Sequence, residues 1–199
     1  MNGPLVILAL AFMLGSIPFG LLMARLFGKG DPRSAGSGNI GATNVSRVAG
    51  FWPAGFLTFF LDALKGSLAV MVASSTLGSP LDGWFTFSPA GWALDSLLLR
   101  WSAALFVVLG HCFSPWLKFK GGKGVATALG AFALLSPWAA LGGVVAFAVT
   151  FFAYRMGSLA SLVGLLTVAV VYGILPQSQA GPHLWPGAAL IFVILARHE

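Results

Sequence analysis

Two glycine-rich loops of this sequence hold most of the polar residues that could bind a ligand. The first loop spans residues 31–47 and contains Gly36, Ser37, Gly38, Asn39, Thr43, Asn44 and Arg47. The second loop spans residues 118–130 and contains Gly121, Gly122, Lys123, Gly124 and Thr127. Glycine lets the backbone approach a ligand closely and adopt positive φ angles. Backbone N–H groups, small polar side chains and cations together favour an anion, and we predict a phosphate.

The second loop leads directly into an apolar helical run, which strengthens this prediction. Free N–H groups and the positive end of a helix dipole would face the anion, with Lys123 beside them. The loop is not a Walker A motif, because the GxxxxGK[ST] spacing is missing. Glycines also serve helix packing in membranes, and we expect that role for glycines inside apolar runs, namely Gly20, Gly130, Gly142 and Gly143.

Other polar residues allow two interpretations each. Arg47 either anchors a helix at the membrane interface or makes a bidentate phosphate contact. Asp62 and Lys65 share one helix face at i, i+3 within an apolar run, so they form an internal ion pair or contact substrate. The segment GSIPFG, residues 15–20, either widens a lateral opening for a lipid chain or only kinks its helix.

The remaining nucleophiles and histidines give little sign of other chemistry. Cys112 is the single cysteine of the sequence, which excludes an internal disulfide framework and a thiolate zinc site. It lies in an apolar run and is expected to be a packed thiol. His111 lies at the cytoplasmic end of the third predicted helix, His198 lies just past the seventh, and His183 is expected to be a solvated bystander in an outer loop. No histidine has a partner at metal-ligand spacing, so we predict no metal and no cofactor. A GxSxG nucleophile motif is also missing.

The composition identifies the class of protein. The 199 residues are 58% hydrophobic and 8% charged, whereas a soluble domain is about 25% charged. A chain of this size cannot bury so much apolar surface in its own core, so lipid must cover the outside. The net charge of +6 is better explained by a cytoplasmic membrane face and an anionic substrate than by nucleic acid.

Apolar runs predict an all-α, polytopic integral membrane protein with about seven transmembrane helices in a single domain, residues 1–199. The helices are expected at about 4–26, 53–76, 97–117, 124–135, 137–154, 157–175 and 184–197. The 124–135 run is too short to cross alone and is expected to be a partial span shielded by protein. Residues 1–26 are expected to be a retained helix, because no cation precedes the apolar run.

Positive charges predict the orientation of these helices. Nine cations fall on one side, and the opposite segments 77–96 and 176–183 contain no Lys or Arg. The basic side is therefore predicted to be cytoplasmic, with the N-terminus outside and the C-terminus inside. The nine are Arg25, Lys29, Arg33, Arg47, Lys118, Lys120, Lys123, Arg155 and Arg197.

The order of these motifs resembles a known family. GSIPFG, GSGNIGATNVSRVAG, LDALKG, GHCFSPWLKFKGGKGVATALG and a final ARHE look like the bacterial acyl-phosphate:glycerol-3-phosphate acyltransferases, the PlsY family. The resemblance implies a seven-helix enzyme of the bacterial cytoplasmic membrane, with a cytoplasmic active site and acyl phosphate and sn-glycerol 3-phosphate as substrates. The products would be lysophosphatidic acid and phosphate. The alternative function, from the residues alone, is a small membrane transporter of a phosphorylated solute. We also expect the protein to be a monomer in contact with membrane lipids.

The resemblance also implies residue roles. Ser37, Arg47 and Lys123 match the groups for the glycerol 3-phosphate end, and His198 matches a histidine near the acceptor. The amides of residues 121–124 and Thr127 match the loop that holds the donor phosphate. The family usually continues past this histidine with an asparagine and a basic tail. This sequence ends at Glu199, so it is expected to be a fragment or a short member.

Overall fold

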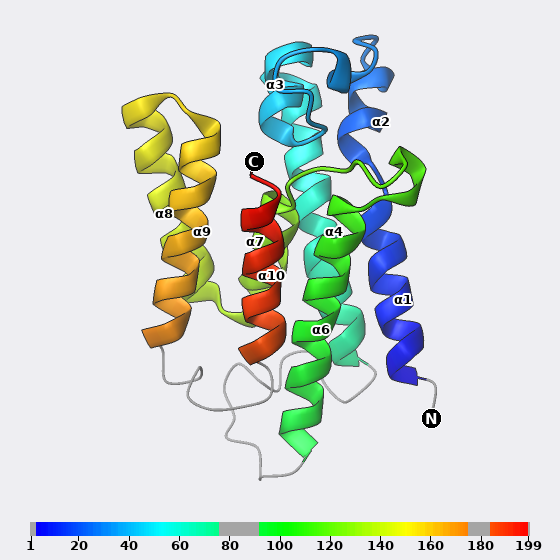
Figure 1. Cartoon of the computed structure of the whole chain (residues 1–199), viewed down its shortest axis with the longest axis vertical. Coiled ribbons are helices and arrows are strands. Elements are labelled where there is room, and N and C mark those ends of the chain that lie inside the picture. The colour runs from blue at the N-terminus through cyan, green and yellow to red at the C-terminus, as the bar shows by residue number, and fades with distance from the viewer. Residues whose placement is uncertain (1–2, 76–91, 175–183, 199) are drawn as a thin grey trace.

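The computed structural model describes residues 3–75, 92–174 and 184–198, and helices are the only regular structure in those residues (Figure 1). The predicted all-α class is confirmed. The longer helices are α1 (Gly3–Ser16), α2 (Phe19–Leu26), α3 (Ala42–Ala49), α4 (Phe56–Ser75), α6 (Trp92–Cys112), α7 (Val125–Leu135), α8 (Pro137–Tyr154), α9 (Gly157–Ile174) and α10 (Leu184–Ala196). Short helical turns lie at Pro32–Ser34, Phe51–Gly55 and Pro115–Leu117.

Five segments of the described chain are long and apolar enough to cross a membrane, so this is a multi-pass membrane protein. They are Pro4–Leu26, Phe51–Ser75, Leu97–Leu117, Pro137–Tyr154 and Gly157–Ile174. Two shorter apolar helices, Val125–Leu135 and Trp185–Ala196, accompany them. The total of seven crossings stays a prediction, because α7 has 11 residues and spans only about 16 Å at 1.5 Å per residue. Neighbouring helices cover α7, whose buried residues include Ala128, Ala131 and Phe132.

Prolines set two of the helix ends. The first predicted helix is interrupted between Ser16 and Phe19, beside Pro18, as the sequence indicated. The third helix ends at Cys112 and not near residue 117, because Pro115 restricts Ser114 to an extended conformation. The polypeptide between Cys112 and α7 is therefore free to form the second glycine-rich loop.

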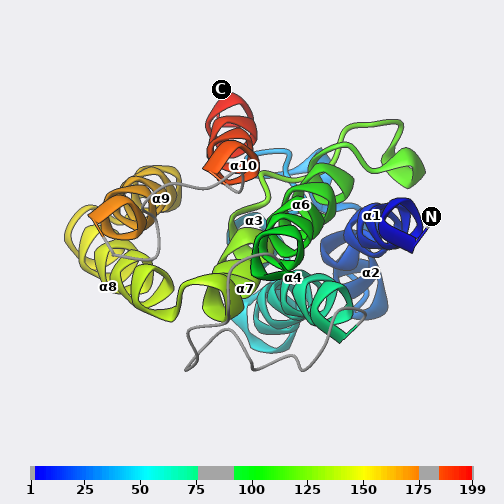
Figure 2. The same cartoon turned by 90° about the horizontal axis from the view of Figure 1, so that it is seen from below.

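Glycines bring neighbouring helices close together. A Cβ on Gly66 of α4 would collide with the Thr127 carbonyl oxygen, and a Cβ on Gly130 of α7 would collide with that of Ala63. Figure 2 shows α4 beside α7, and α8 paired with α9 at one side of the bundle. Packing is thus confirmed as the role of Gly130, and the same collision test confirms it for Gly20 and Gly143.

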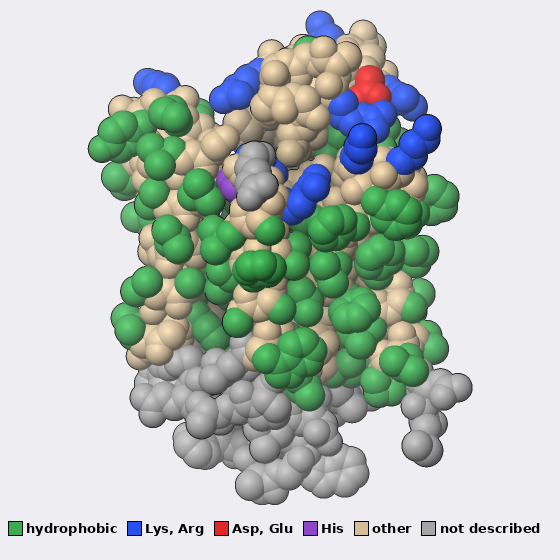
Figure 3. All heavy atoms as spheres, viewed as in Figure 1, with side chains coloured by type: hydrophobic (Ala, Val, Ile, Leu, Met, Phe, Trp, Pro, Cys, Tyr) green, Lys and Arg blue, Asp and Glu red, His purple; other side chains and the backbone are tan. Residues whose placement is uncertain are grey.

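On the face shown in Figure 3, charged and hydrophobic side chains occupy different regions. Lys and Arg side chains gather at the end where α2 and α3 lie, and hydrophobic side chains cover the length of the helices below. The N-terminus lies at the opposite end from these cations (Figure 1). This separation agrees with the predicted orientation, which stays a prediction. The segments expected on the outer side, with His183, lie largely outside the described residues.

Candidate active site

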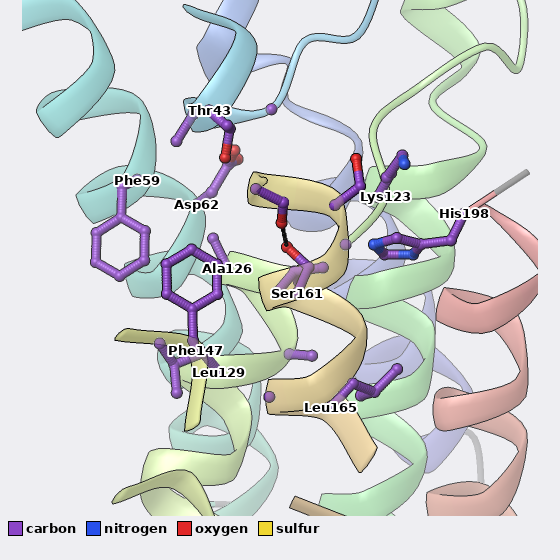
Figure 4. A pocket seen from close by; sticks show the side chains of 18 of the residues that line it. Thr43, Phe59, Asp62, Lys123, Ala126, Leu129, Phe147, Ser161, Leu165 and His198 are labelled. Carbon is purple, nitrogen blue, oxygen red and sulfur yellow. Dashed lines mark hydrogen bonds between the residues drawn. The ribbon is translucent and has the colours of Figure 1, made fainter. Parts of the chain in front are cut away.

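The two glycine-rich loops meet over one cavity of about 260 Å³. Ser37, Arg47, Lys123 and His198 all line it, although up to 161 residues of sequence separate them. In Figure 4, Lys123 and His198 lie on one wall of this cavity, and Thr43 and Asp62 lie on the other. The four residues predicted from their types and from the resemblance to do the chemistry therefore face one space.

The other predicted binding residues divide into two groups. Those that line the cavity are Asn39, Thr43, Asn44 and Gly124. Those that lie outside its described lining are Gly36, Gly38, Gly121, Gly122 and Thr127. Gly36 and Gly38 have φ angles of 62° and 66° and give the first loop its shape. Thr127 is fully buried, with its carbonyl oxygen against Gly66 of α4.

The predicted role of the Gly121 and Gly122 amides needs correction. The Gly121 N–H donates to the Cys112 carbonyl oxygen at 3.0 Å, and the Gly122 N–H donates to that of His111 at 3.1 Å. Both amides are therefore committed to the end of α6 and are not available to an anion in this structure. These glycines instead fix the loop on α6, because a Cβ on either would collide with His111.

The first loop is organised by the side chain of Asn44. Its Nδ2 donates to the carbonyl oxygens of Pro32 at 2.8 Å, Ala35 at 3.1 Å and Asn39 at 2.8 Å. Its Oδ1 accepts the Ser37 N–H at 2.8 Å. Asn44 is only 2% exposed, so this amide ties the loop to α3 and places Ser37 and Asn39 at the cavity.

We expect the substitution Asn44→Asp to lower the free energy of unfolding by about 2 kcal/mol. A carboxylate cannot replace the two N–H donors of Asn44 that three carbonyl oxygens now share, and unsatisfied buried groups cost about 1–3 kcal/mol. Asn39→Asp is the matched control, because the Asn39 Oδ1 only accepts, from the Gly41 N–H at 2.8 Å. Thermal unfolding in detergent measures both variants, and equal shifts would contradict this role of Asn44.

Lys123 and Gly124 occupy the approach to α7. Gly124 has a φ of 84° and precedes the first turn of α7, whose N–H groups have no partner within the helix. Among the described residues, no acceptor is found for the N–H of Lys123 or Gly124. Burial, followed by the charge of Arg197, lowers the pKa of Lys123. A cation and free N–H groups therefore stand together at the cavity, as the second loop predicted.

His198 is oriented by its own helix. Its Nδ1 lies 2.8 Å from the Ile194 carbonyl oxygen, so Nδ1 carries the proton and donates, which leaves Nε2 as the acceptor in the neutral ring. Nε2 is buried and has no partner among the described residues. Burial lowers the pKa of His198 despite the hydrogen bond to Ile194, and Lys123 lowers it further. His198 is thus a neutral imidazole with an unused lone pair at the cavity.

Below these polar groups the cavity is apolar. Its lining there includes Leu129, Phe147 and Leu165, which lie below Lys123 and His198 in Figure 4, and Phe59, which lies near Asp62 on the opposite wall. Helix α9 adds Ser158 and Ser161. Sequence reasoning missed all of these residues; polar and small residues at 157, 158, 161 and 164 on one side of α9 were the available signal.

The acidic residue in the second membrane span belongs to a buried ion pair. Asp62 Oδ1 lies 2.7 Å from the Lys65 ammonium, which confirms the internal ion pair expected from their spacing. Asp62 and His111 also contribute to the cavity wall. Among the described residues, no group of three or more His, Cys, Asp or Glu side chains could hold a metal ion.

Fold and site together define a multi-pass membrane protein with a cavity that is cationic at one end and apolar at the other. The family model described as glycerol-3-phosphate acyltransferase matches residues 5–199, and the chain belongs to this family. A glycerol-3-phosphate acyltransferase of Anaeromyxobacter sp. (strain K) is 41% identical over 196 residues, which are 98% of this chain and 89% of that protein. One of Syntrophotalea carbinolica is 42% identical over 195 residues, with the same coverage of both chains.

Solved structures agree with this family. The crystal structure of PlsY (YgiH), an integral membrane glycerol 3-phosphate acyltransferase, in its glycerol 3-phosphate form has a TM-score of 0.81 and 34% identity to this chain. That comparison covers 98% of this chain and 88% of the other. A lysophosphatidic acid form has a TM-score of 0.79 and 33% identity. The resemblance drawn from the motifs is confirmed.

Proposed function

We propose that this protein transfers an acyl group from acyl phosphate to the 1-hydroxyl of sn-glycerol 3-phosphate, at the cytoplasmic face of the bacterial inner membrane. Membership of the family supports the acyltransferase activity. The observation that carries the proposal is the two-part cavity, with Arg47 and Lys123 at one end and Phe59 and Leu129 at the other. An acyl phosphate has the same two parts, an anionic head and an apolar chain.

The polar end must hold two phosphates against their mutual repulsion. Arg47 and Lys123 provide fixed positive charge, and the free N–H groups near Gly124 provide hydrogen-bond donors that need no reorganisation. Positioning two reactants in this way can remove about 7–11 kcal/mol of barrier. The same donors can stabilise the negative charge that develops on the acyl oxygen during the reaction.

The reaction needs no covalent enzyme intermediate, because acyl phosphate is already activated. The glycerol hydroxyl oxygen forms a bond to the acyl carbon, and the bond from that carbon to the phosphate oxygen breaks. Inorganic phosphate leaves with the electron pair. The hydroxyl proton passes to Nε2 of His198 or to a substrate phosphate, both of which can accept it near neutral pH. His111 and His183 lack the acid of an HxxxxD pair, because Trp116 and Ala188 stand at that spacing.

The pH dependence of kcat/KM separates these two proton acceptors. With His198 as base, activity is present above its pKa and is lost as pH falls through that value, which burial places below the ordinary 6.5. At high pH, activity is lost as Lys123 loses its proton, at a pKa below the ordinary 10.5. We expect His198→Gln to remove the acidic limb and Lys123→Arg to move the alkaline limb upward. An acidic limb that persists in His198→Gln identifies the phosphate as acceptor.

The function is tested with purified protein reconstituted in vesicles, given palmitoyl phosphate and labelled glycerol 3-phosphate. We expect labelled lysophosphatidate and one equivalent of inorganic phosphate to appear in a protein-dependent manner. Labelled glycerol 3-phosphate that crosses intact vesicles without chemical change would instead support a transporter. Coenzyme A thioester as a sole effective donor would contradict the proposed acyl phosphate.

A further inference from the structure

A buried triad of Asp62, Lys65 and His111 lies at the wall of the cavity, where Asp62 and His111 form part of the lining and Lys65 does not. The Lys65 Nζ atom is 2.7 Å from Asp62 Oδ1, 2.9 Å from His111 Nδ1 and 3.1 Å from the carbonyl oxygen of Ile17. The side chains of Lys65 and Asp62 are 0% and 2% exposed, and that of His111 is 4% exposed. The nearly buried triad thus joins the break between α1 and α2 to α4 and α6.

The chemistry of Lys65 fixes the state of the His111 ring. An ammonium group donates three hydrogen bonds and accepts none. Lys65 Nζ lies within hydrogen-bond distance of the Ile17 carbonyl oxygen and of His111 Nδ1, and it forms an ion pair with Asp62 Oδ1. Nδ1 of His111 therefore accepts from Lys65, and the ring proton lies on Nε2. The helix break at Pro18 matters here, because it leaves the Ile17 carbonyl oxygen available to Lys65.

His111 also holds the second glycine-rich loop in place. Its carbonyl oxygen accepts the Gly122 N–H at 3.1 Å. Its ring packs so closely on Gly122 that a Cβ at that position would collide with Nε2. Gly122 is followed immediately by Lys123 and Gly124, which line the cavity. The position of the imidazole therefore determines where the loop places the Lys123 side chain.

We infer that Lys65 and His111 are positioning residues for the anion site: the triad holds the His111 ring, and the ring holds residues 121–124 so that Lys123 reaches the substrate phosphate. This role rests on the proposed function and extends it to Lys65 and His111. A buried ion pair that only packs helices would leave substrate affinity unchanged once both charges are removed.

The first test compares His111→Asn with His111→Leu. An asparagine oxygen can take the place of Nδ1 and accept from Lys65, whereas leucine cannot. We expect His111→Leu to raise KM for glycerol 3-phosphate about 30-fold with a smaller fall in kcat, and His111→Asn to stay within about threefold of wild type. Equal KM values for the two variants would overturn the inference.

The second test removes both charges together in the double variant Asp62→Asn/Lys65→Met. Without an uncompensated buried charge the fold is expected to persist, and thermal unfolding checks this. We expect the folded double variant to raise KM for glycerol 3-phosphate at least about tenfold. A wild-type KM in that folded variant would overturn the inference. If the double variant does not fold, the two His111 variants still decide.

Ser74→Ala is the matched control, because Ser74 is a buried polar residue of the same helix, 3% exposed. Within the described part of the chain its hydroxyl donates only to the Val70 carbonyl oxygen, at 2.8 Å. Its KM should equal that of wild type. Calorimetric measurement of glycerol 3-phosphate binding to wild type and to each variant tests the positioning role separately from the proposed function. Wild type that binds but transfers no acyl group contradicts the proposed function, whereas variants that all bind as wild type contradict the positioning role.

Discussion

Removal of either cation from the polar end of the cavity is expected to lower kcat/KM about 10³-fold. In Arg47→Met or Lys123→Met, one of the two cations at the polar end is lost. The remaining cation must then offset the negative charge of both substrates. A charge pair about 4 Å apart near a protein surface is worth roughly 4 kcal/mol, which corresponds to about three orders of magnitude in rate. The measurement is the initial rate of lysophosphatidate formation at varied concentrations of both substrates.

Arg47→Lys refines this prediction, because it keeps the charge and removes the planar fork that can grip a phosphate with two hydrogen bonds. We expect an intermediate loss of about 10–100-fold. Arg155→Met is the control: Arg155 follows α8, outside the described lining of the cavity, and packs on Phe152. A loss in Arg155→Met as large as that in Arg47→Met would show that overall positive charge, and not the cavity, controls the rate.

A single methyl group at Gly130 is expected to reduce both stability and activity strongly. The new Cβ of Gly130→Ala would collide with the carbonyl oxygen, carbonyl carbon and Cα of Ala63, and these backbone atoms cannot rotate away. Helices α4 and α7 must then separate, at a cost of about 3 kcal/mol or more. Because α7 begins next to Lys123 and Gly124, we also expect the rate to fall about 100-fold.

Gly142→Ala provides the comparison for this helix contact. Its Cβ would meet only side-chain methyl groups, Val171 Cγ2 at 3.3 Å and Thr167 Cγ2 at 3.6 Å. We expect its stability to stay within about 0.5 kcal/mol of wild type, and its activity to be normal. Thermal unfolding and initial rates of the two variants, measured in one detergent, test the account. Similar behaviour of Gly130→Ala and Gly142→Ala would contradict it.

The helices and the polar residues of the site could be predicted because their signals are local. Long apolar runs specify spans, and Pro18 and Pro137 mark interruptions within a few residues. Ser37, Arg47 and Lys123 stand out because polar residues are rare in this chain and need a reason. The end of the third helix was predicted too late, because its apolar residues continue past the point where Pro115 ends the hydrogen bonding.

The errors concern partners that are distant in the sequence. The glycines at 121 and 122 were assigned to an anion, but their amides bind carbonyl oxygens of α6, and no sequence pattern shows which N–H groups are already satisfied. Phe59 and Leu129 were missed because a side chain that faces lipid and one that lines an apolar cavity have the same character. The contact between Lys65 and His111 joins residues 46 positions apart that no local spacing connects.

The central claim is that one cavity holds both anionic substrates at the same time. Calorimetric titration of glycerol 3-phosphate, with and without a saturating acyl phosphonate that cannot transfer its acyl group, tests it most directly. We expect glycerol 3-phosphate to bind in both cases with one site per chain, and to lose affinity in Arg47→Met and Lys123→Met. Loss of glycerol 3-phosphate binding whenever the phosphonate is bound would show that the two compete for one phosphate site, and would contradict the account.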